Sequence, residues 1–191
     1  MWEAAWQDGS VDDNALVAAV RSGDRDAFGV LVDRETAAVY RTCLRILGRP
    51  RDAEDVTQES FVAAYRAIGQ FRGEGSLRGW LLRIATRQSY RRLAQRRPDA
   101  ELDSVGEARL SDPSADPTRV VVAAEQRADV RRAVNELTDP YREVVALRFF
   151  GEMSLAEVAD ATGRPINTVK THLRRGLERL RQVVAPEETD R

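Results

Sequence analysis

The spacing of apolar residues is the feature that most constrains the fold of this chain. From Leu16 to Val184 they recur mostly at intervals of three and four residues, the repeat of a helix that buries one face. No stretch shows the sustained alternation of apolar and polar residues, bounded by turn signals, that is typical of sheet strands. The sequence therefore predicts an all-α fold.

One stretch interrupts this pattern. Residues 98–117 (PDAELDSVGEARLSDPSADP) are acidic, poor in large apolar residues and rich in Pro, Ser, Asp and Gly, which is typical of a flexible linker. We expect the linker to join two helical domains, each large enough to fold alone. The expected organisation is an N-terminal extension (residues 1–10), a first domain (11–97), the linker (98–117), a second domain (118–185) and a tail (186–191). Trp2 and Trp6 of the extension would share one face of a helix, or else lie in a disordered tail.

Composition argues against several classes of function. No run approaches the roughly 20 apolar residues of a membrane-spanning helix, and the first residues do not resemble a secretory signal, so we expect a cytoplasmic protein. The single cysteine, Cys43, lies in an apolar helical pattern, which favours a buried small side chain over a redox switch. Cys43 and the single histidine, His172, are too few for a metal cluster, and the chain has no Gly-rich phosphate loop or nucleophile elbow. The sequence therefore predicts no metal, no cofactor, no small-molecule substrate and no catalytic residue.

The second domain contains a helix start followed by a capping box. Asp139 and Pro140 are typical of a helix start, with the aspartate as the capping acceptor, and Gly151 is expected to end that helix. Ser154 and Glu157 have the spacing of a capping box, in which each side chain bonds a backbone N–H of the other residue. A short second helix should therefore begin at this point.

A longer helix is expected after the turn at Gly163, beginning near Asn167. Its buried stripe should consist of Val169, Leu173, Leu177 and Leu180. The opposite face carries the candidate DNA-binding residues Asn167, Thr168, Lys170, Thr171, Arg174 and Arg175, with Arg181 near its edge. In a docked helix-turn-helix the start of the second helix faces base edges, so the first four are candidates for base contacts and the arginines for phosphate contacts. The alternative is a solvated basic face on a structural helix.

In the first domain, the helix expected over residues 51–68 has an exposed stripe opposite its buried side. The expected buried residues are Val56, Phe61, Ala63, Ala64 and Ile68. The exposed stripe contains Asp55, Glu59, Val62 and Arg66, with Gln58 beside them. A valine among charged residues suggests a surface for a partner, and a plain solvated face is the alternative.

A second helix of the first domain is expected to follow a loop over residues 71–80 (FRGEGSLRGW). Its buried residues should be Leu81, Leu82, Ala85 and Leu93. The other face should carry Trp80, Arg83, Arg87, Tyr90 and Arg91, with Arg92, Arg96 and Arg97 extending the positive charge. Such a face suits single-stranded DNA, because guanidinium groups hold the backbone while flat rings stack on bases. Trp80 could equally pack into the core as an anchor at the helix end.

The chain resembles the extracytoplasmic-function (ECF) sigma factors, the smallest members of the sigma-70 class. Three motifs in the family's order carry the resemblance: DAEDVTQESFVAAYRAI, FRGEGSLRGWLLRIA, and LTDPYREVVALRFFGEMSLAEVADATGRPINTVKTHLRRGLERLR. The resemblance implies a region 2 domain that melts and reads the −10 element and a region 4 domain that reads the −35 element. It implies three partners: core RNA polymerase, contacted at its largest-subunit coiled coil and its flap region, promoter DNA, and an anti-sigma factor.

The resemblance also gives roles to particular residues. Asp55, Gln58 and Glu59 match positions that face the polymerase coiled coil, and Val62 and Arg66 continue that surface. The loop from Phe71 to Arg78 matches the segment that captures a flipped −10 base, so Phe71 joins the candidate −10 residues. The linker is expected to run toward the polymerase active-site channel.

The chain departs from its relatives at several of these positions. Thr86 and Arg87 stand where many relatives have Asn after Ile-Ala, and Tyr90 lies near a common aspartate, so the −10 preference is expected to differ. Asn167 replaces a glycine often found before Thr-Val-Lys, which could alter −35 contacts or simply cap the helix.

Two other classes of protein fit the sequence less well. The second domain also resembles the DNA-binding domain of response-regulator activators, but their receiver domain needs alternating strands and helices that the first hundred residues do not predict. An enzyme with a DNA-binding domain would need an active site, and the single histidine lies in the expected recognition helix.

Overall fold

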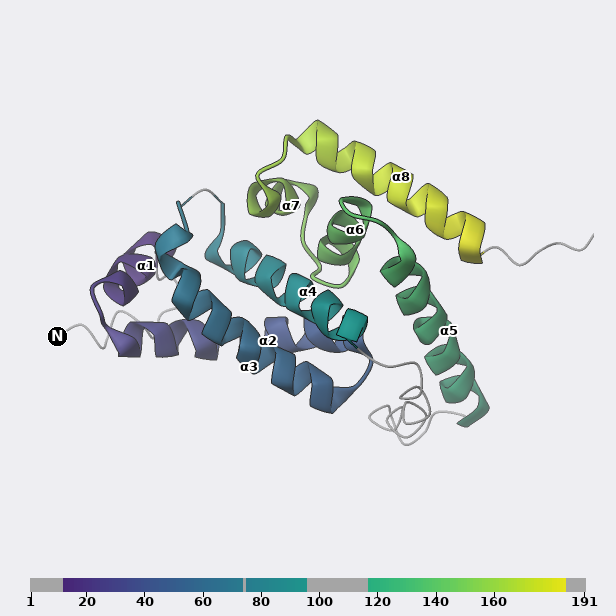
Figure 1. The fold of residues 1–191 in the computed structure, drawn as a ribbon, viewed down its shortest axis with the longest axis horizontal. Coiled ribbons are helices and arrows are strands. Elements are labelled where there is room, and N and C mark those ends of the chain that lie inside the picture. The colour runs from purple at the N-terminus through teal and green to yellow at the C-terminus, as the bar shows by residue number, and fades with distance from the viewer. Residues whose placement is uncertain (1–11, 74, 96–116, 185–191) are drawn as a thin grey trace, which may run out of the picture.

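The structure, a computed structural model, describes residues 12–73, 75–95 and 117–184, and every regular element in them is helical (Figure 1). The elements are α1 (Asp13–Arg21), α2 (Arg25–Leu47), α3 (Pro50–Ala67), the short 3-10 helix η2 (Ile68–Gln70), α4 (Leu77–Gln95), α5 (Pro117–Glu136), α6 (Tyr141–Phe149), α7 (Leu155–Thr162) and α8 (Ile166–Val184). The all-α prediction is confirmed. Trp2 and Trp6, Arg96 and Arg97, the tail and all of the predicted linker except Pro117 lie outside the described residues. None of the described helices is both long and apolar enough to cross a membrane.

Local capping sets where the first helices begin and end. The Asp24 carboxylate accepts hydrogen bonds from the backbone N–H groups of Asp26 and Ala27, at 2.9 and 3.1 Å, which satisfies two free donors at the start of α2. Gly48 ends α2 with a φ of 73°, and Pro50 then opens α3 at the position where a missing N–H costs nothing.

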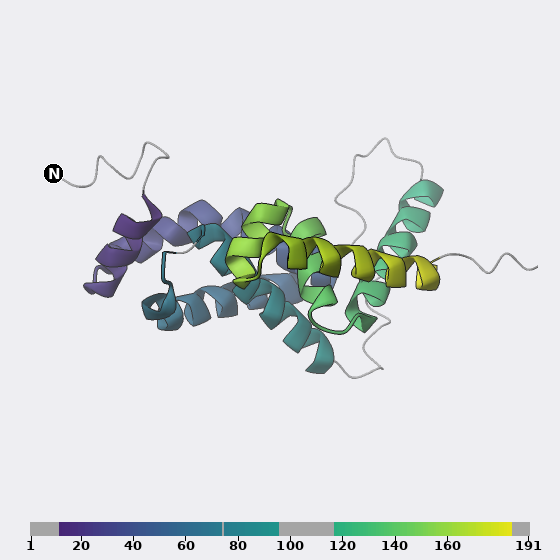
Figure 2. The same cartoon turned by 90° about the horizontal axis from the view of Figure 1, so that it is seen from above.

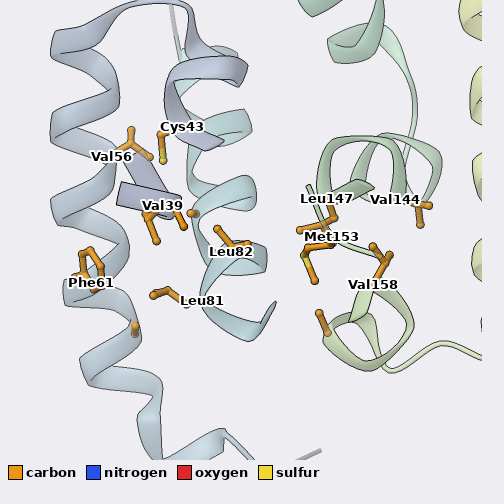
Figure 3. Close-up of a cluster of buried hydrophobic side chains, with 14 of the residues drawn as sticks. Val39, Cys43, Val56, Phe61, Leu81, Leu82, Val144, Leu147, Met153 and Val158 are labelled. Carbon is orange, nitrogen blue, oxygen red and sulfur yellow. The ribbon is translucent and has the colours of Figure 1, made fainter. Parts of the chain in front are cut away.

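Helices α2, α3 and α4 pack side by side and enclose the first half of the core (Figures 1 and 3). The side chains drawn there include Val39, Cys43, Val56, Leu81 and Leu82, all of which are buried. Cys43 is a buried free thiol, and burial raises its pKa, which agrees with the structural role predicted for it.

Helices α5 to α8 form a second group, in which α6 and α7 lie between α4 and α8 (Figures 1 and 2). Val144, Leu147, Met153 and Val158 are buried there, and they belong to the same continuous apolar cluster as the side chains of α2 to α4 (Figure 3). A further buried cluster joins Ile46 and Tyr90 of the first group to α5 and α6. The two helical groups of the prediction are therefore present, and they are docked on each other through apolar side chains.

The loop expected over residues 71–80 is shorter than predicted, because α4 begins at Leu77. The Asp13 carboxylate accepts the backbone N–H of Leu77 at 2.8 Å, and the Ser76 hydroxyl accepts that of Gly79 at 3.0 Å. These two acceptors satisfy free backbone N–H groups at the start of α4, so the helix includes four more residues than predicted. The prediction missed this start because Asp13 comes from α1, far away in the sequence.

The ends of α6 also differ from the prediction. The helix begins at Tyr141 with Pro140 as its cap, and the Asp139 carboxylate pairs with Arg142 at 3.1 Å instead of capping. The helix ends at Phe149, and Glu152, not Gly151, takes the positive φ of 56°. Gly151 is needed for another reason, since a Cβ there would lie 2.8 Å from the Leu147 carbonyl oxygen.

Candidate functional site

The predicted stripe on α3 is exposed and forms one wall of a groove. All five of its residues, Asp55, Gln58, Glu59, Val62 and Arg66, are exposed. Together with Ala63 of α3 and Gln88, Arg91, Arg92 and Gln95 of α4, they line a groove of about 710 Å³. The groove therefore offers a half-exposed valine between acidic and basic groups, which suits a helical partner carrying charges of both signs.

Arg92 holds the acidic wall of this groove in place. Its guanidinium lies 2.7 Å from the Glu59 carboxylate, 3.6 Å from that of Asp55 and 3.4 Å from that of Asp52. Asp55 and Glu59 remain mostly exposed, so they can still meet a partner. From the sequence, Arg92 was expected only to extend a basic face. The only signal for its role was an arginine row on the helix that follows an acidic stripe.

Arg91 also lies in this groove. The sequence predicted that it would share a face with Arg83 and Arg87, but it lies on a neighbouring face of α4. The physical reason is the helical repeat. At about 100° per residue, the eight positions from Arg83 to Arg91 rotate the side chain by about 80°, enough to move it onto the next face of α4.

The remaining arginines of the predicted −10 face converge on one carboxylate, Glu143 of α6. Arg83 Nε lies 2.9 Å and an Arg87 guanidinium nitrogen 3.1 Å from Glu143 Oε1, while Arg164 Nη1 lies 2.6 Å from Oε2. Arg83 also donates to the Ala161 carbonyl oxygen at 3.0 Å. Glu143 is only 7% exposed, so both of its oxygens are enclosed by guanidinium groups from α4 and from the turn after α7.

The aromatic residues of the predicted −10 face are largely buried. Tyr90 is 9% exposed, packs against α5 and α6, and has the Arg142 guanidinium 4.8 Å above its ring centre. Burial raises the pKa of its hydroxyl. Phe71 is 4% exposed and meets the half-buried Trp80 edge to face at 5.7 Å. The aromatic part of the expected face is therefore largely covered and Trp80 packs against the core, whereas the Arg87 side chain remains 62% exposed.

The loop before α4 is anchored by α1, which the sequence analysis did not foresee. The Arg21 guanidinium donates to the carbonyl oxygens of Ile68, Gly69 and Phe71. Asp13 caps α4 and also pairs with Arg34 of α2 at 2.7 Å. These contacts fix the entry and exit of the loop relative to α4.

The ion pairs of Glu143 with Arg83, Arg87 and Arg164 predict a contribution to the stability of the fold that is lost at acid pH. Burial opposes ionisation, but hydrogen bonds and charges from Arg83 and Arg164 outweigh it and lower the pKa of Glu143. A lowered folded-state pKa gives stability that is present above the unfolded value of about 4.5 and lost as pH falls through the folded value. We therefore expect the melting temperatures of the wild type and of Glu143→Gln to converge as the pH falls below about 4.5. If the difference in melting temperature between the two proteins did not change with pH, the ion pairs would contribute nothing to stability.

The helix-turn-helix has the local structure predicted for it. The Ser154 hydroxyl accepts the backbone N–H of Glu157 at 3.2 Å, and the Glu157 carboxylate accepts that of Ser154 at 2.7 Å, which completes the capping box. Gly163 ends α7 with a φ of 67°. Val169 is buried and Leu173, Leu177 and Leu180 are half-buried, which is the predicted inner stripe of α8.

Gly176 lets α8 approach α6, and the sequence analysis missed it. A Cβ at this position would lie 2.8 Å from Val145 Cγ2, so only glycine allows this spacing. On the opposite side of α8, Asn167, Lys170, Arg174 and Arg175 are exposed. Helix α8 lies at the outer edge of the molecule, with α6 and α7 between it and α4 (Figure 1).

Two of the predicted phosphate-binding arginines already have partners on the protein. Arg174 pairs with Glu178 one turn later at 2.7 Å. Arg179, whose guanidinium lies 4.0 Å above the Tyr141 ring, and Arg175 lower the pKa of the Tyr141 hydroxyl. Thr168 and Thr171 are half-exposed, and the Thr171 hydroxyl donates to the Asn167 carbonyl oxygen at 2.9 Å. Within the described residues, no group of three or more His, Cys, Asp and Glu is placed to hold a metal ion.

Comparison with known proteins assigns a family to this arrangement. Residues 31–98 match the family described as Sigma-70 region 2, and residues 127–180 match Sigma-70, region 4. The chain is 36% identical over 174 residues to the ECF RNA polymerase sigma factor SigW of Bacillus subtilis (strain 168), covering 87% of this chain and 93% of that protein. The chain belongs to the ECF RNA polymerase sigma factors. The response-regulator alternative is thereby set aside.

Two solved structures are similar to the fold. CnrH in complex with the cytosolic domain of CnrY matches with a TM-score of 0.61 and 26% identity, covering 90% of this chain and 96% of that chain. The sigma factor RpoE in complex with the anti-sigma factor NepR, from Bartonella quintana, matches with a TM-score of 0.52 and 19% identity, covering 86% and 98%.

Proposed function

We propose that this chain joins core RNA polymerase and directs it to promoters with −10 and −35 elements. One observation supports this most strongly: a single chain presents both an acidic, partly apolar groove on α3 and α4 and a capped helix-turn-helix whose α8 faces outward. A factor that only bound DNA would need the second surface and not the first. The chain has no catalytic role of its own in this proposal, and we expect it to act in the cytoplasm with polymerase and DNA.

The groove is the proposed docking site for the largest-subunit coiled coil. Asp55, Gln58 and Glu59 present acidic and amide groups, and the half-exposed Val62 offers an apolar contact between them. Arg66 borders the same groove, and Arg91 and Arg92 from α4 belong to this surface. We assign Arg91 to polymerase binding because of this position.

DNA binding is divided between α4 and α8 in this proposal. Arg83 and Arg87 hold the backbone of the separated −10 strand, Tyr90 and Trp80 offer rings to its bases, and Phe71 shapes the base-capturing loop. On α8, Asn167, Thr168, Lys170 and Thr171 face −35 base edges, and Arg174 and Arg175 hold phosphates. The flap region of polymerase is the proposed partner of region 4.

An anti-sigma factor is the proposed inhibitory partner. The support is the likeness of this fold to that of RpoE, solved with the anti-sigma factor NepR, and to that of CnrH, solved with the cytosolic domain of CnrY.

A binding titration without DNA tests the first step. Fluorescently labelled chain is titrated with core polymerase, and we expect a saturable complex at submicromolar concentration, about −8 kcal/mol or tighter. An activator that reaches polymerase only through DNA would form no such complex. Absence of binding to core enzyme would overturn the proposed function.

A further inference from the structure

The edge of α8 that borders α6 carries two exposed arginines, Arg175 and Arg179. Among the ion pairs of the described residues, none involves either of them. We propose that Arg179, held over the ring of Tyr141, contacts a backbone phosphate of the promoter duplex, so that region 4 also binds DNA through this edge of α8 and the start of α6. The inference rests on the proposed function for its claim that α8 binds DNA.

Tyr141, the first residue of α6, is held in place by three residues of α8. The Arg179 guanidinium carbon lies 4.0 Å from the centre of the tyrosine ring, where a cation is attracted to the π face. The His172 ring meets the tyrosine edge to face, with 5.6 Å between the ring centres. A Cβ on Gly176 would lie only 3.5 Å from the Tyr141 Cβ. The ring therefore gives Arg179 a defined position in the free chain, which reduces the entropy lost when its guanidinium binds an anion.

Arg179 lies further along α8 than the residues proposed to face base edges. The 11 positions from Thr168 to Arg179 span about 16 Å at about 1.5 Å per residue. The major groove is only about 12 Å wide. A helix that points its first turn at the base edges therefore carries Arg179 out to the rim of the groove, where the phosphates lie.

A second row of basic residues lies on another edge of α8. At about 100° per residue, Arg174 and Arg179 point about 140° apart around the helix axis. Lys170 and Arg181 share the edge of Arg174, and Arg175 shares that of Arg179. A helix in the major groove has one sugar–phosphate backbone on each side of it. The two basic edges are therefore placed to meet different strands of the duplex.

The chemistry of the edge with Arg179 suits a phosphate. Arginine binds phosphates through paired N–H donors, and a guanidinium with no ion pair loses only water when it does so. Arg179 and Arg175 lower the pKa of the Tyr141 hydroxyl, which makes this hydroxyl a stronger donor to an anion. By contrast, Arg174 pairs with Glu178 at 2.7 Å and must leave it to bind DNA. A phosphate contact by Arg179 breaks no ion pair.

Removing the charge of Arg179 tests the contact. The full chain is titrated with duplex DNA carrying the −35 element over a series of salt concentrations. We expect Arg179→Ala to weaken binding by about three- to tenfold at low salt and to lower the slope of log K against log salt by about 0.9. Arg127→Ala removes an exposed arginine of α5 and should keep the wild-type slope. Equal slopes for the two variants would overturn the proposal, whereas no binding by the wild type would overturn the proposed role of α8 itself.

A double-mutant cycle tests whether Tyr141 positions Arg179. Tyr141→Phe keeps the aromatic face under the guanidinium, and Tyr141→Leu removes it. We expect Arg179→Ala to cost at least about twofold more affinity in the Tyr141→Phe chain than in the Tyr141→Leu chain. Any general loss of stability from the leucine cancels in this comparison. Equal costs in both chains would show that Tyr141 supports only the fold, and would contradict its positioning role.

Neutral phosphates placed in one strand at a time test the arrangement of the two edges. The probe is the same duplex with methylphosphonate linkages at the rim of the −35 element, in either strand. We expect Arg179→Ala to lose its sensitivity to the substitution in one strand and Arg174→Ala to lose it in the other. If both variants lost sensitivity in the same strand, the assignment of the two edges to different strands would be wrong.

Discussion

Replacing Asp55 and Glu59 together with alanine is expected to weaken binding to core polymerase by at least about tenfold, or about 1.4 kcal/mol. Both carboxylates lie on the open wall of the groove, 63% and 52% exposed, so their charges are available to a partner. Their loss should cost the fold little, because exposed ion pairs contribute about 1 kcal/mol or less, and Arg92 keeps Asp52 as a partner. The affinity is measured by titrating labelled chain with core enzyme.

The matched control for this pair is Asp33→Ala with Glu54→Ala. Both residues are exposed acids of the same domain, on α2 and α3, and neither lines the groove. We expect the control to bind core polymerase like the wild type. The polymerase-binding role would be contradicted if both double variants bound equally well. It would also be contradicted if the Asp55, Glu59 variant lost thermal stability without losing affinity for core enzyme.

Replacing Arg174 and Arg175 with alanine is expected to weaken binding to duplex DNA carrying the −35 element by about 10- to 100-fold at low salt. Both side chains lie on the exposed face of α8. The slope of log K against log salt should fall by about 1.8, since each phosphate contact contributes about 0.9. Binding measured over a series of salt concentrations gives both quantities.

The same slope also shows how many of these two arginines contact phosphates. Arg174 pairs with Glu178 and Arg175 lowers the pKa of the Tyr141 hydroxyl, so a fall in slope of about 0.9 would mean that only one of the two arginines contacts a phosphate. Arg127→Ala with Arg132→Ala removes two exposed arginines of α5 and is the charge-matched control. If both double variants gave the same slope, the effect would be one of net charge, and the assignment to α8 would be wrong.

The features predicted well from the sequence are those set by neighbouring residues. The capping box of Ser154 and Glu157 spans three positions, so its two hydrogen bonds could be predicted from spacing alone. The exposed stripe of α3 and the inner stripe of α8 follow from the helical repeat. The exposed positions of Asp55 and Asn167 could therefore be predicted before any packing was known.

The features that were missed depend on residues far apart in the sequence. Helical periodicity places Tyr90 on one face of α4, but it cannot show that α5 and α6 cover that face. Glu143 looked like an ordinary polar position of a helix start, and only the fold brings Arg83 to it from 60 positions away. Arg92 likewise meets Glu59 across 33 positions. Such pairs need the tertiary arrangement, because no local pattern marks them.

Transcription by core polymerase with mapping of RNA 5′ ends is the measurement that tests the central claim most directly. Core enzyme with and without the purified chain is given a library of genomic DNA fragments from the source organism. We expect starts that depend on the chain and share one pair of sequence elements near −10 and −35. We also expect these starts to disappear with the Asp55→Ala, Glu59→Ala variant. Starts that are the same with and without the chain, or that share no upstream elements, would contradict this claim.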